Sequence, residues 1–404
     1  MKRYVLIVLI SFLFFIPTYS ALDIEIKSEN ALLYNLKDHE IIYEKNSEKQ
    51  TYIASLTKIV TILIALENIE DINEKIILKD NIFKGLVEKD ASVAGFKVGE
   101  EVTYKDLLYG AMLPSGADAT NALAINLFGD EQNYVNEMNQ LIKKLNIKNT
   151  YFINTSGLDE IGQKATLKDL LTITLYAFKN EDFLKIFTTK NYKTSNNRLN
   201  LNSTLRFYEK KYDLDTNIIT GGKTGYTDLA GLCLLSYTKK DDFELLLITT
   251  NAPVTENRYP YNVTDALNIY NHIFENYHYF TILSNNQTIT KISNKYSNQS
   301  FTDAKYVGDD FKMFLSKKIT KKDINYNFDT KKVVNPFTDI NKPVGKFDIK
   351  YQDKEIFSGD LFLAEKVSFS LLIFIKENIK AIIFSFIVII VLFFKRKKRF
   401  YGNR

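Results

Sequence analysis

Cysteine, histidine, proline and glycine are all scarce in this chain of 404 residues, and each shortage excludes a class of protein. The single cysteine, Cys233, lies in an apolar run and can form no intramolecular disulfide, so stability must come from hydrophobic cores. With 6 prolines, 16 glycines and 45% hydrophobic residues, the composition is not that of a disordered protein. The length suffices for one large domain and a smaller one.

The shortage of histidine excludes several kinds of catalytic site. His39, His272 and His278 form no His-Glu-x-x-His zinc motif, and none stands in a pattern typical of a serine protease triad. The sequence also has no Gly-x-Ser-x-Gly motif, no P-loop and no dinucleotide-binding fingerprint. We therefore expect neither a metal nor a nucleotide cofactor.

Positive charge is concentrated at the two ends of the chain. Eight lysines and arginines stand before the first long apolar run or after the last one, and without them the formal net charge falls from +5 to −3. Because the stretch between the ends is mildly acidic, we expect the basic balance to reflect membrane topology and expect no nucleic-acid partner.

Both ends carry segments typical of membrane targeting. Residues 1–21 combine a short basic start, an apolar centre and small residues at the end, which predicts a signal peptide, with an uncleaved anchor as the alternative. Residues 381–394 are an unbroken apolar run, and flanking residues extend it to a predicted transmembrane anchor at 377–396. A helix lying in the membrane interface is the alternative. The basic tail, 397–404, is then cytoplasmic, so we expect a cell-membrane protein whose main domain is extracytoplasmic.

Between the ends, the pattern of apolar residues predicts an α+β fold. Apolar runs at 31–36 and 40–43 predict one hairpin, and runs at 229–238 and 243–250 predict another. A helix that is apolar on nearly every face is predicted over 56–69. Further helices are predicted at 103–112, 118–128 and 263–274. Beyond residue 277, short alternating runs predict a separate small β domain.

The first candidate for chemistry is Ser55-Leu56-Thr57-Lys58, at the start of the buried helix. A spacing of three residues places Ser55 and Lys58 on one helix face, where the lysine can accept the proton of the serine hydroxyl. Burial favours the neutral amine that this role requires. A second Ser-x-x-Lys, Ser236 with Lys239, stands in a predicted strand, where the two side chains point to opposite faces.

Two further motifs follow in the chain. Ser115 lies in Pro114-Ser115-Gly116-Ala117, on the link between two predicted helices, where it can relay a proton or simply cap the next helix. Lys223-Thr224-Gly225 directly precedes the second predicted hairpin, where a cation and a hydroxyl can bind a carboxylate and Gly225 lets the backbone come close. Penicillin-binding proteins and class A β-lactamases share this set of motifs.

On these motifs the chain resembles the low-molecular-mass penicillin-binding proteins, the serine D-alanyl-D-alanine carboxypeptidases that trim peptidoglycan stem peptides. The resemblance extends from the first hairpin to about residue 365 and includes Asn154-Thr155-Ser156-Gly157-Leu158-Asp159. It implies a catalytic domain at 22–276, with an antiparallel sheet flanked by helices and a helical subdomain. It also implies a C-terminal β domain at 277–366.

The same resemblance implies roles for the residues and names the partners. Ser55 would be acylated by the penultimate D-alanine carbonyl, with Lys58 as proton acceptor and Ser115 in proton transfer. Backbone N–H groups of Ser55 and Tyr226 would form the oxyanion hole. The implied substrate-binding residues are Lys223, Thr224, Gly225 and Tyr226. Peptidoglycan stem peptides would be the substrates and β-lactam antibiotics covalent inhibitors.

Departures from the family pattern leave alternatives open. The third position of the middle motif, usually asparagine, is Ala117, and Asn121 one turn further on can offer an amide instead. The predicted transmembrane segment stands where many relatives carry an amphipathic anchor. A β-lactamase would need a water-directing glutamate, and no Glu-x-x-x-Asn stands between Ser115 and Lys223. A D,D-endopeptidase and a catalytically idle wall-binding relative are further alternatives.

Overall fold

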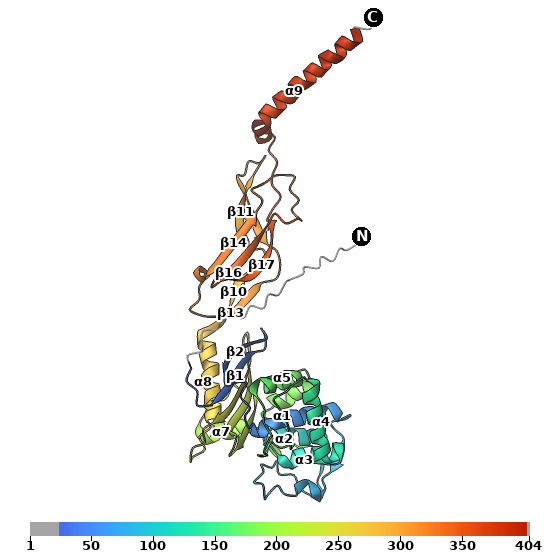
Figure 1. The fold of residues 1–404 in the computed structure, drawn as a ribbon, viewed down its shortest axis with the longest axis vertical. Helices are drawn as coiled ribbons and strands as arrows, with labels where there is room; N and C mark the ends of the chain where they lie inside the picture. Colours follow the sequence, from blue (N-terminus) through green and yellow to red (C-terminus); the bar gives the residue numbers. More distant parts are fainter. Residues whose placement is uncertain (1–23, 402–404) are drawn as a thin grey trace. The chain divides into compact units, whose positions relative to one another are not determined.

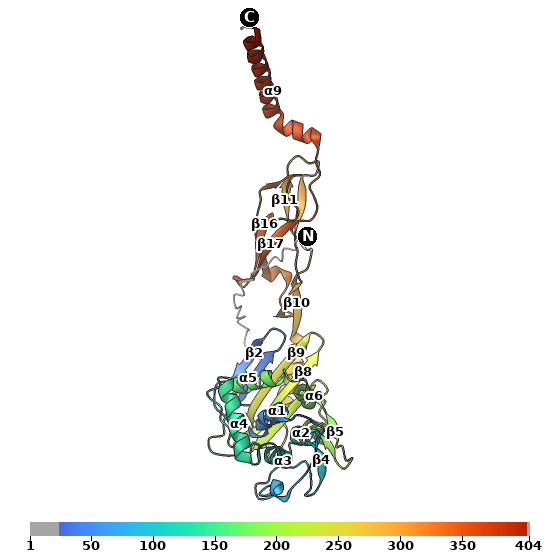
Figure 2. The ribbon, with the colours of Figure 1, turned by 90° about the vertical axis from the view of Figure 1, so that its right-hand side faces the viewer.

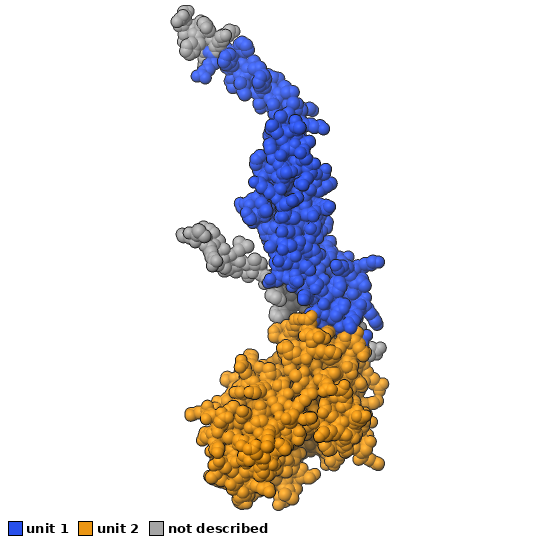
Figure 3. All heavy atoms as spheres, turned by 180° about the vertical axis from the view of Figure 1, so that it is seen from behind, with its two compact units in different colours: residues 1–16, 276–404 blue, residues 17–275 orange. Residues whose placement is uncertain are grey.

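The structure is a computed structural model that describes residues 24–401. It divides into two compact units, one ending at Glu275 and the other continuing from Asn276 (Figure 3). The predicted signal peptide, 1–21, lies outside the described residues.

A five-stranded antiparallel sheet forms the centre of the first unit, with the spatial order β2-β1-β9-β8-β7. Both predicted hairpins are present: β1 (Asn30–Asn35) pairs with β2 (Glu40–Lys45), and β8 (Gly231–Lys240) pairs with β9 (Phe243–Ala252). The edge strand β7 (Gly221–Thr227) carries the Lys-Thr-Gly motif. One edge of that strand is therefore open to a ligand.

Side chains of the sheet alternate between two helical layers. Leu32, Leu235 and Leu246 belong to the main core formed with the helical layer. On the opposite face, α8 (Tyr261–Asn276) donates the hydroxyl of Tyr270 to the Ser236 carbonyl at 3.0 Å. Figure 1 shows α8 on one side of β1 and β2, and helices α1 to α5 on the other.

The central helix α1 (Lys58–Asn68) has eight buried residues and contacts each of the helices α2 to α6 (Figure 2). The predicted capping box is confirmed, because Thr103 and Asp106 exchange hydrogen bonds at the start of α2. The remaining helices of this layer are α2 (Tyr104–Met112), α3 (Ala117–Phe128), α4 (Glu131–Lys144), α5 (Leu167–Ala177) and α6 (Glu181–Thr188). The short helix α7 (Thr204–Tyr212) contacts β7. The short strand pairs are β3 (Lys75–Ile77) with β4 (Glu101–Thr103), and β5 (Asn191–Lys193) with β6 (Asn200–Asn202).

The second unit is a β domain with its own hydrophobic core, which confirms the predicted α+β class with a C-terminal β region. Strands β10 (Tyr277–Leu283) and β13 (Phe311–Ser316) form a two-stranded sheet. The other sheet has the order β14-β16-β17-β12-β11-β15. Its strands are β11 (Thr288–Asn294), β12 (Phe301–Tyr306), β14 (Ile324–Thr330), β15 (Val333–Val334), β16 (Gly345–Tyr351) and β17 (Lys354–Leu363).

A long apolar helix, α9 (Leu371–Tyr401), follows the β domain. Its segment Leu371–Arg396 is, among the described residues, the one helical stretch long and apolar enough to cross a membrane. The helix begins six residues before the predicted span at 377, because Leu371 and the residues after it continue the helical pattern. By length and composition, α9 can anchor the protein to a membrane.

Candidate active site

Ser55 lies in a 3-10 turn, η1 (Ala54–Thr57), which leads directly into α1. The sequence predicts a regular helix here, but Ala54 has a φ of 45°, in the left-handed region that non-glycine residues rarely adopt. Such a backbone costs about 1–3 kcal/mol and persists only where its surroundings enforce it. The turn that presents the serine is therefore held by the segments packed around it.

Two glycines allow those segments to approach the turn. A Cβ atom at Gly157, whose φ is 82°, would overlap the carbonyl oxygen of Ala54. A Cβ atom at Gly225 of β7 would lie 3.0 Å from the Ser55 nitrogen, closer than real Cβ atoms normally come. Gly225 and Gly157 thus let two segments pack closely against the serine turn from different sides, and the substrate-binding role of Gly225 stays a prediction.

Lys58 lies on the first turn of α1 with its side chain almost fully buried, and its Nζ atom is 3.0 Å from Ser55 Oγ. Burial lowers the pKa of Lys58 from 10.5 to about 7, while the negative charge of Asp118 partly opposes the shift. A large share of the amine is then neutral at neutral pH. The predicted nucleophile and base are thus brought together in the required geometry.

The carbonyl oxygen of Ser156 is the second partner of the Lys58 amine and was not predicted. The loop that carries it is held by Asn154, whose Oδ1 accepts hydrogen bonds from Gly157 N at 2.7 Å and from Gln163 Nε2 at 3.1 Å. This fixed carbonyl orients the amine toward Ser55. The motif Asn154-Thr155-Ser156-Gly157 was visible in the sequence, but its contact with Lys58 was not.

Ser115 lies on the link between α2 and α3, buried and with a φ of 66°. The capping alternative is wrong, because the N-cap of α3 is Gly116 and no side chain caps that helix. Among the described residues the Ser115 hydroxyl has no hydrogen-bond partner. An unpartnered buried hydroxyl costs free energy, which a bound ligand or a proton-transfer partner can recover.

The residues after Ser115 hold a loop in place. Asp118 accepts hydrogen bonds from the backbone nitrogens of residues 94, 95 and 96 at 2.7, 2.9 and 3.1 Å, respectively. The suggestion that Asn121 replaces the missing family asparagine is wrong, because its amide donates to the Ile82 carbonyl at 3.0 Å. Ala117 itself is buried.

Lys223 and Thr224 present a second buried amine and a hydroxyl on β7. Lys223 Nζ donates to the Thr224 carbonyl at 2.8 Å, and the Thr224 hydroxyl lies 2.6 Å from that of Thr204 on α7. Burial, and after it the charge of Lys58, holds the pKa of Lys223 well below its ordinary value. The amines of Lys223 and Lys58 repel one another when both are protonated, and an anion bound here would be stabilised by both.

Tyr226 follows on the same strand and is more than one-third exposed. Its hydroxyl donates to Asp228 at 2.7 Å, and the exposed guanidinium of Arg258 lies 5.5 Å from the ring centroid. Sequence reasoning missed Arg258, which is 35 residues after Lys223 in the chain. It places a further positive charge beside the end of β7.

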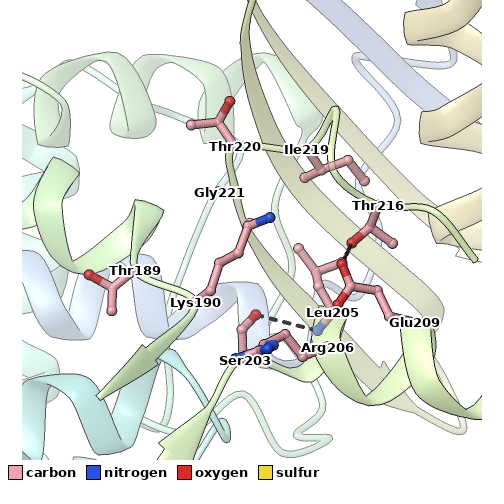
Figure 4. Close-up of a pocket in the computed structure, with 11 residues that line it drawn as sticks. Thr189, Lys190, Ser203, Leu205, Arg206, Glu209, Thr216, Ile219, Thr220 and Gly221 are labelled. Atoms are coloured by element: carbon pink, nitrogen blue, oxygen red, sulfur yellow. Dashed lines mark hydrogen bonds between the residues drawn. The ribbon is translucent and has the colours of Figure 1, made fainter.

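A pocket borders the beginning of β7, beside Gly221 and Gly222, which immediately precede Lys223 (Figure 4). Its wall includes Arg206 and Glu209 of α7, and the Glu209 carboxylate accepts a hydrogen bond from Thr216. The pocket contains none of the predicted catalytic residues.

The competing pair Ser236 and Lys239 lies on strand β8, as predicted, and each side chain has a different partner. The Ser236 hydroxyl lies 3.0 Å from that of Tyr270, while Lys239 pairs with Glu244 on the next strand. Burial raises the pKa of the Cys233 thiol to about 12, so this residue is no nucleophile at neutral pH. Among the described residues, no group of three acidic, histidine or cysteine side chains is placed to hold a metal ion.

A strained serine turn beside a buried lysine, on an antiparallel sheet with a helical layer, defines the penicillin-binding class of serine enzymes. Penicillin binding protein 5 from Haemophilus influenzae has this fold, with a TM-score of 0.60 at 21% identity over 85% of this chain and 98% of that one. The Streptomyces K15 DD-transpeptidase matches with a TM-score of 0.55 at 25% identity, over 62% of this chain and 98% of that one.

The family described as D-alanyl-D-alanine carboxypeptidase matches residues 17–254. The chain therefore belongs to the D-alanyl-D-alanine carboxypeptidase family. It is 30% identical to the D-alanyl-D-alanine carboxypeptidase DacF of Bacillus subtilis (strain 168), over 68% of this chain and 69% of that protein. It is also 28% identical to a D-alanyl-D-alanine endopeptidase of Pseudomonas aeruginosa, over 61% of this chain and 74% of that protein.

Proposed function

We propose that the protein is a serine D-alanyl-D-alanine carboxypeptidase that removes the terminal D-alanine from peptidoglycan stem pentapeptides. The observation that carries the proposal is the pair formed by Ser55 Oγ and the buried Lys58 amine, 3.0 Å apart, in a chain of this family. A binding protein would not need a desolvated amine beside a serine, because burying it costs free energy.

Acylation begins when Ser55 Oγ attacks the carbonyl carbon of the penultimate D-alanine and the hydroxyl proton moves to the neutral Lys58 amine. The tetrahedral intermediate then expels the terminal D-alanine, whose nitrogen takes a proton through the Ser115 hydroxyl. Water attacks the resulting ester, the peptide carboxylate leaves, and Ser55 regains its proton. The role of Ser115 in this proton transfer is supported by its buried hydroxyl, which has no other partner among the described residues.

The oxyanion of the intermediate would be bound by the backbone N–H groups of Ser55 and Tyr226. Ser55 is one of the first residues of η1, where backbone N–H groups lack acceptors within the helix. The hydrogen bonds of the turn begin with Leu56 N, which donates to the Ile53 carbonyl. Tyr226 lies on the edge strand, next to the glycine that packs against the Ser55 nitrogen. Two such donors in a desolvated site typically supply the largest electrostatic contribution to acyl transfer.

The terminal carboxylate of the substrate would be bound by the Lys223 amine and the Thr224 hydroxyl. A carboxylate favours the protonated form of Lys223, which burial disfavours in the free enzyme. β-Lactam antibiotics, whose carboxylate and reactive carbonyl have a similar arrangement, would acylate Ser55 in the same position. The catalytic unit would then lie outside the cytoplasm, tethered to the cell membrane, a topology that the predicted signal peptide and the apolar helix α9 support.

The test is D-alanine release from a muramyl pentapeptide by the wild type, Ser55→Ala and Ser236→Ala. We expect release by the wild type and by Ser236→Ala, and none by Ser55→Ala. A cross-linked muropeptide dimer is supplied in parallel, because a relative is named an endopeptidase. Cleavage of the dimer without D-alanine release would replace the carboxypeptidase assignment by an endopeptidase. No cleavage of either substrate would indicate an idle relative.

A further inference from the structure

Three connections of the β domain meet at the end from which α9 leaves. Strands β11, β14 and β17 run toward this end, while β12 and β16 start from it, as their antiparallel pairing requires. The connections are residues 295–300, 331–344 and 364–370, and the last of them leads into α9. We call these three segments the collar.

The collar carries exposed aromatic rings that continue onto α9. Phe337 is 76% exposed and Phe369 is 50% exposed, and their ring centroids lie 6.3 Å apart. Phe369 lies 5.8 Å from Phe374 of α9, which in turn lies 4.8 Å from Tyr296. The Ser370 nitrogen donates to the Tyr296 carbonyl at 2.8 Å. The start of the apolar helix and the aromatic rings therefore form one continuous surface.

The collar is also basic, unlike the opposite end of the same domain. It contains five exposed lysines against two acidic residues: Lys295, Lys331, Lys332, Lys342 and Lys366, with Asp339 and Glu365. The connections at the opposite end, 284–287, 307–310, 317–323 and 352–353, contain four lysines against four aspartates and no aromatic residue. Composition and charge thus distinguish the two ends of one small domain.

We propose that the collar is a lipid-binding surface that inserts its aromatic rings into the headgroup region of an anionic bilayer. Tyrosine collects at membrane interfaces because its ring is amphipathic, and exposed phenylalanine side chains of interfacial segments insert at the boundary between headgroups and acyl chains. Lysines near an anionic leaflet add attraction that falls off within a Debye length. Both features occur where α9 begins, so the β domain rests on the membrane. The aromatic rings and lysines of the collar hold it there in addition to α9.

The first test removes α9 so that the collar acts alone. The buried core of the β domain ends at Val367, so a chain that ends at Ser370 keeps that entire core. We expect this chain to sediment with vesicles that contain phosphatidylglycerol and more weakly with pure phosphatidylcholine vesicles. The double variant Lys331→Glu with Lys332→Glu should weaken binding about tenfold or more.

A matched control at the opposite end is available. Lys321 and Lys322 are also adjacent and exposed, and their double replacement by glutamate should leave vesicle binding unchanged. Equal losses for the two double variants would show a nonspecific charge effect and overturn the proposal. The same holds if the truncated chain ignores the vesicles, or if it binds only purified peptidoglycan.

The second test uses the full chain, which contains no tryptophan, so that one introduced tryptophan reports its surroundings. In vesicles with brominated acyl chains, Phe337→Trp should be quenched and should emit at shorter wavelength than in water. Val307→Trp, at a half-exposed position of the opposite end, should show neither effect. An unquenched tryptophan at position 337 would mean that the β domain stands clear of the lipid.

Discussion

The pKa of Lys58 makes the rate of acylation depend on pH in a defined direction. Only the neutral amine accepts the Ser55 proton, so the rate of acylation by a penicillin should rise with pH through the Lys58 pKa of about 7. An exposed lysine with a pKa of 10.5 would be only ~0.03% neutral at pH 7, whereas one with a pKa of 7 is ~50% neutral. Burial thus raises the neutral fraction of the Lys58 amine about 1,500-fold at this pH.

These fractions fix the shape of the profile below neutrality. From pH 7 to pH 6 the neutral fraction, and with it the second-order acylation rate, should fall about fivefold, and from pH 6 to pH 5 about tenfold more. The assay is stopped-flow labelling by a fluorescent penicillin over this range. Lys58→Arg should be nearly inactive at every pH, because a guanidinium group does not release its proton in this range.

The variant Asp118→Asn tests the charge that opposes the downward shift of the Lys58 pKa. The carboxylate of Asp118 favours the protonated amine, so its loss should lower the pKa of Lys58 and move the profile to lower pH. Asp130→Asn, which keeps the exposed cap of α4, should leave the profile in place. A rate that is flat from pH 5 to 8, or a profile that moves to higher pH in Asp118→Asn, would refute this reasoning.

Two further predictions follow from the packing around the site. Gly157→Ala should abolish acylation and lower the free energy of unfolding by more than ~2 kcal/mol, because the new methyl group overlaps the Ala54 carbonyl. The control Gly129→Ala, at a similar φ but in open space, should cost only ~1 kcal/mol. Thermal melts and penicillin labelling check both variants, and equal melting temperatures would refute the clash. Ala117→Asn should raise kcat/KM for D-alanine release about fivefold, the worth of one hydrogen bond, and a wild type that is inactive while this variant is active would mean that the chain is an idle relative.

The sequence predicts the chemistry of the site better than its shape. Ser55, Lys58 and the Lys-Thr-Gly strand could be recognised because their spacing along one helix and one strand is set by local geometry. The left-handed backbone of Ala54 could not be predicted, because it depends on two glycines, Gly157 and Gly225, from segments more than 100 residues away. The contact between Lys58 and Ser156 likewise joins residues 98 positions apart. Local patterns carry no information about such contacts.

The middle of the chain shows the same limit. Helical periodicity correctly placed Asn121 one turn beyond Ala117, but its amide binds the Ile82 carbonyl, in a segment whose position only the folded chain determines. The capping box at Thr103 was predictable because all its groups lie within four residues. The helix α9 begins before the predicted span at 377–396, because charged residues interrupt its apolar pattern without interrupting the helix.

The identity of the acylated residue tests the central claim most directly. The protein is labelled with a fluorescent penicillin, digested, and its labelled peptide is identified by mass spectrometry, alongside Ser55→Ala. We predict a single adduct on the peptide that carries Ser55, and no label on the variant. An adduct on the peptide that carries Ser236, or label that survives Ser55→Ala, would contradict the assignment of Ser55 as the nucleophile.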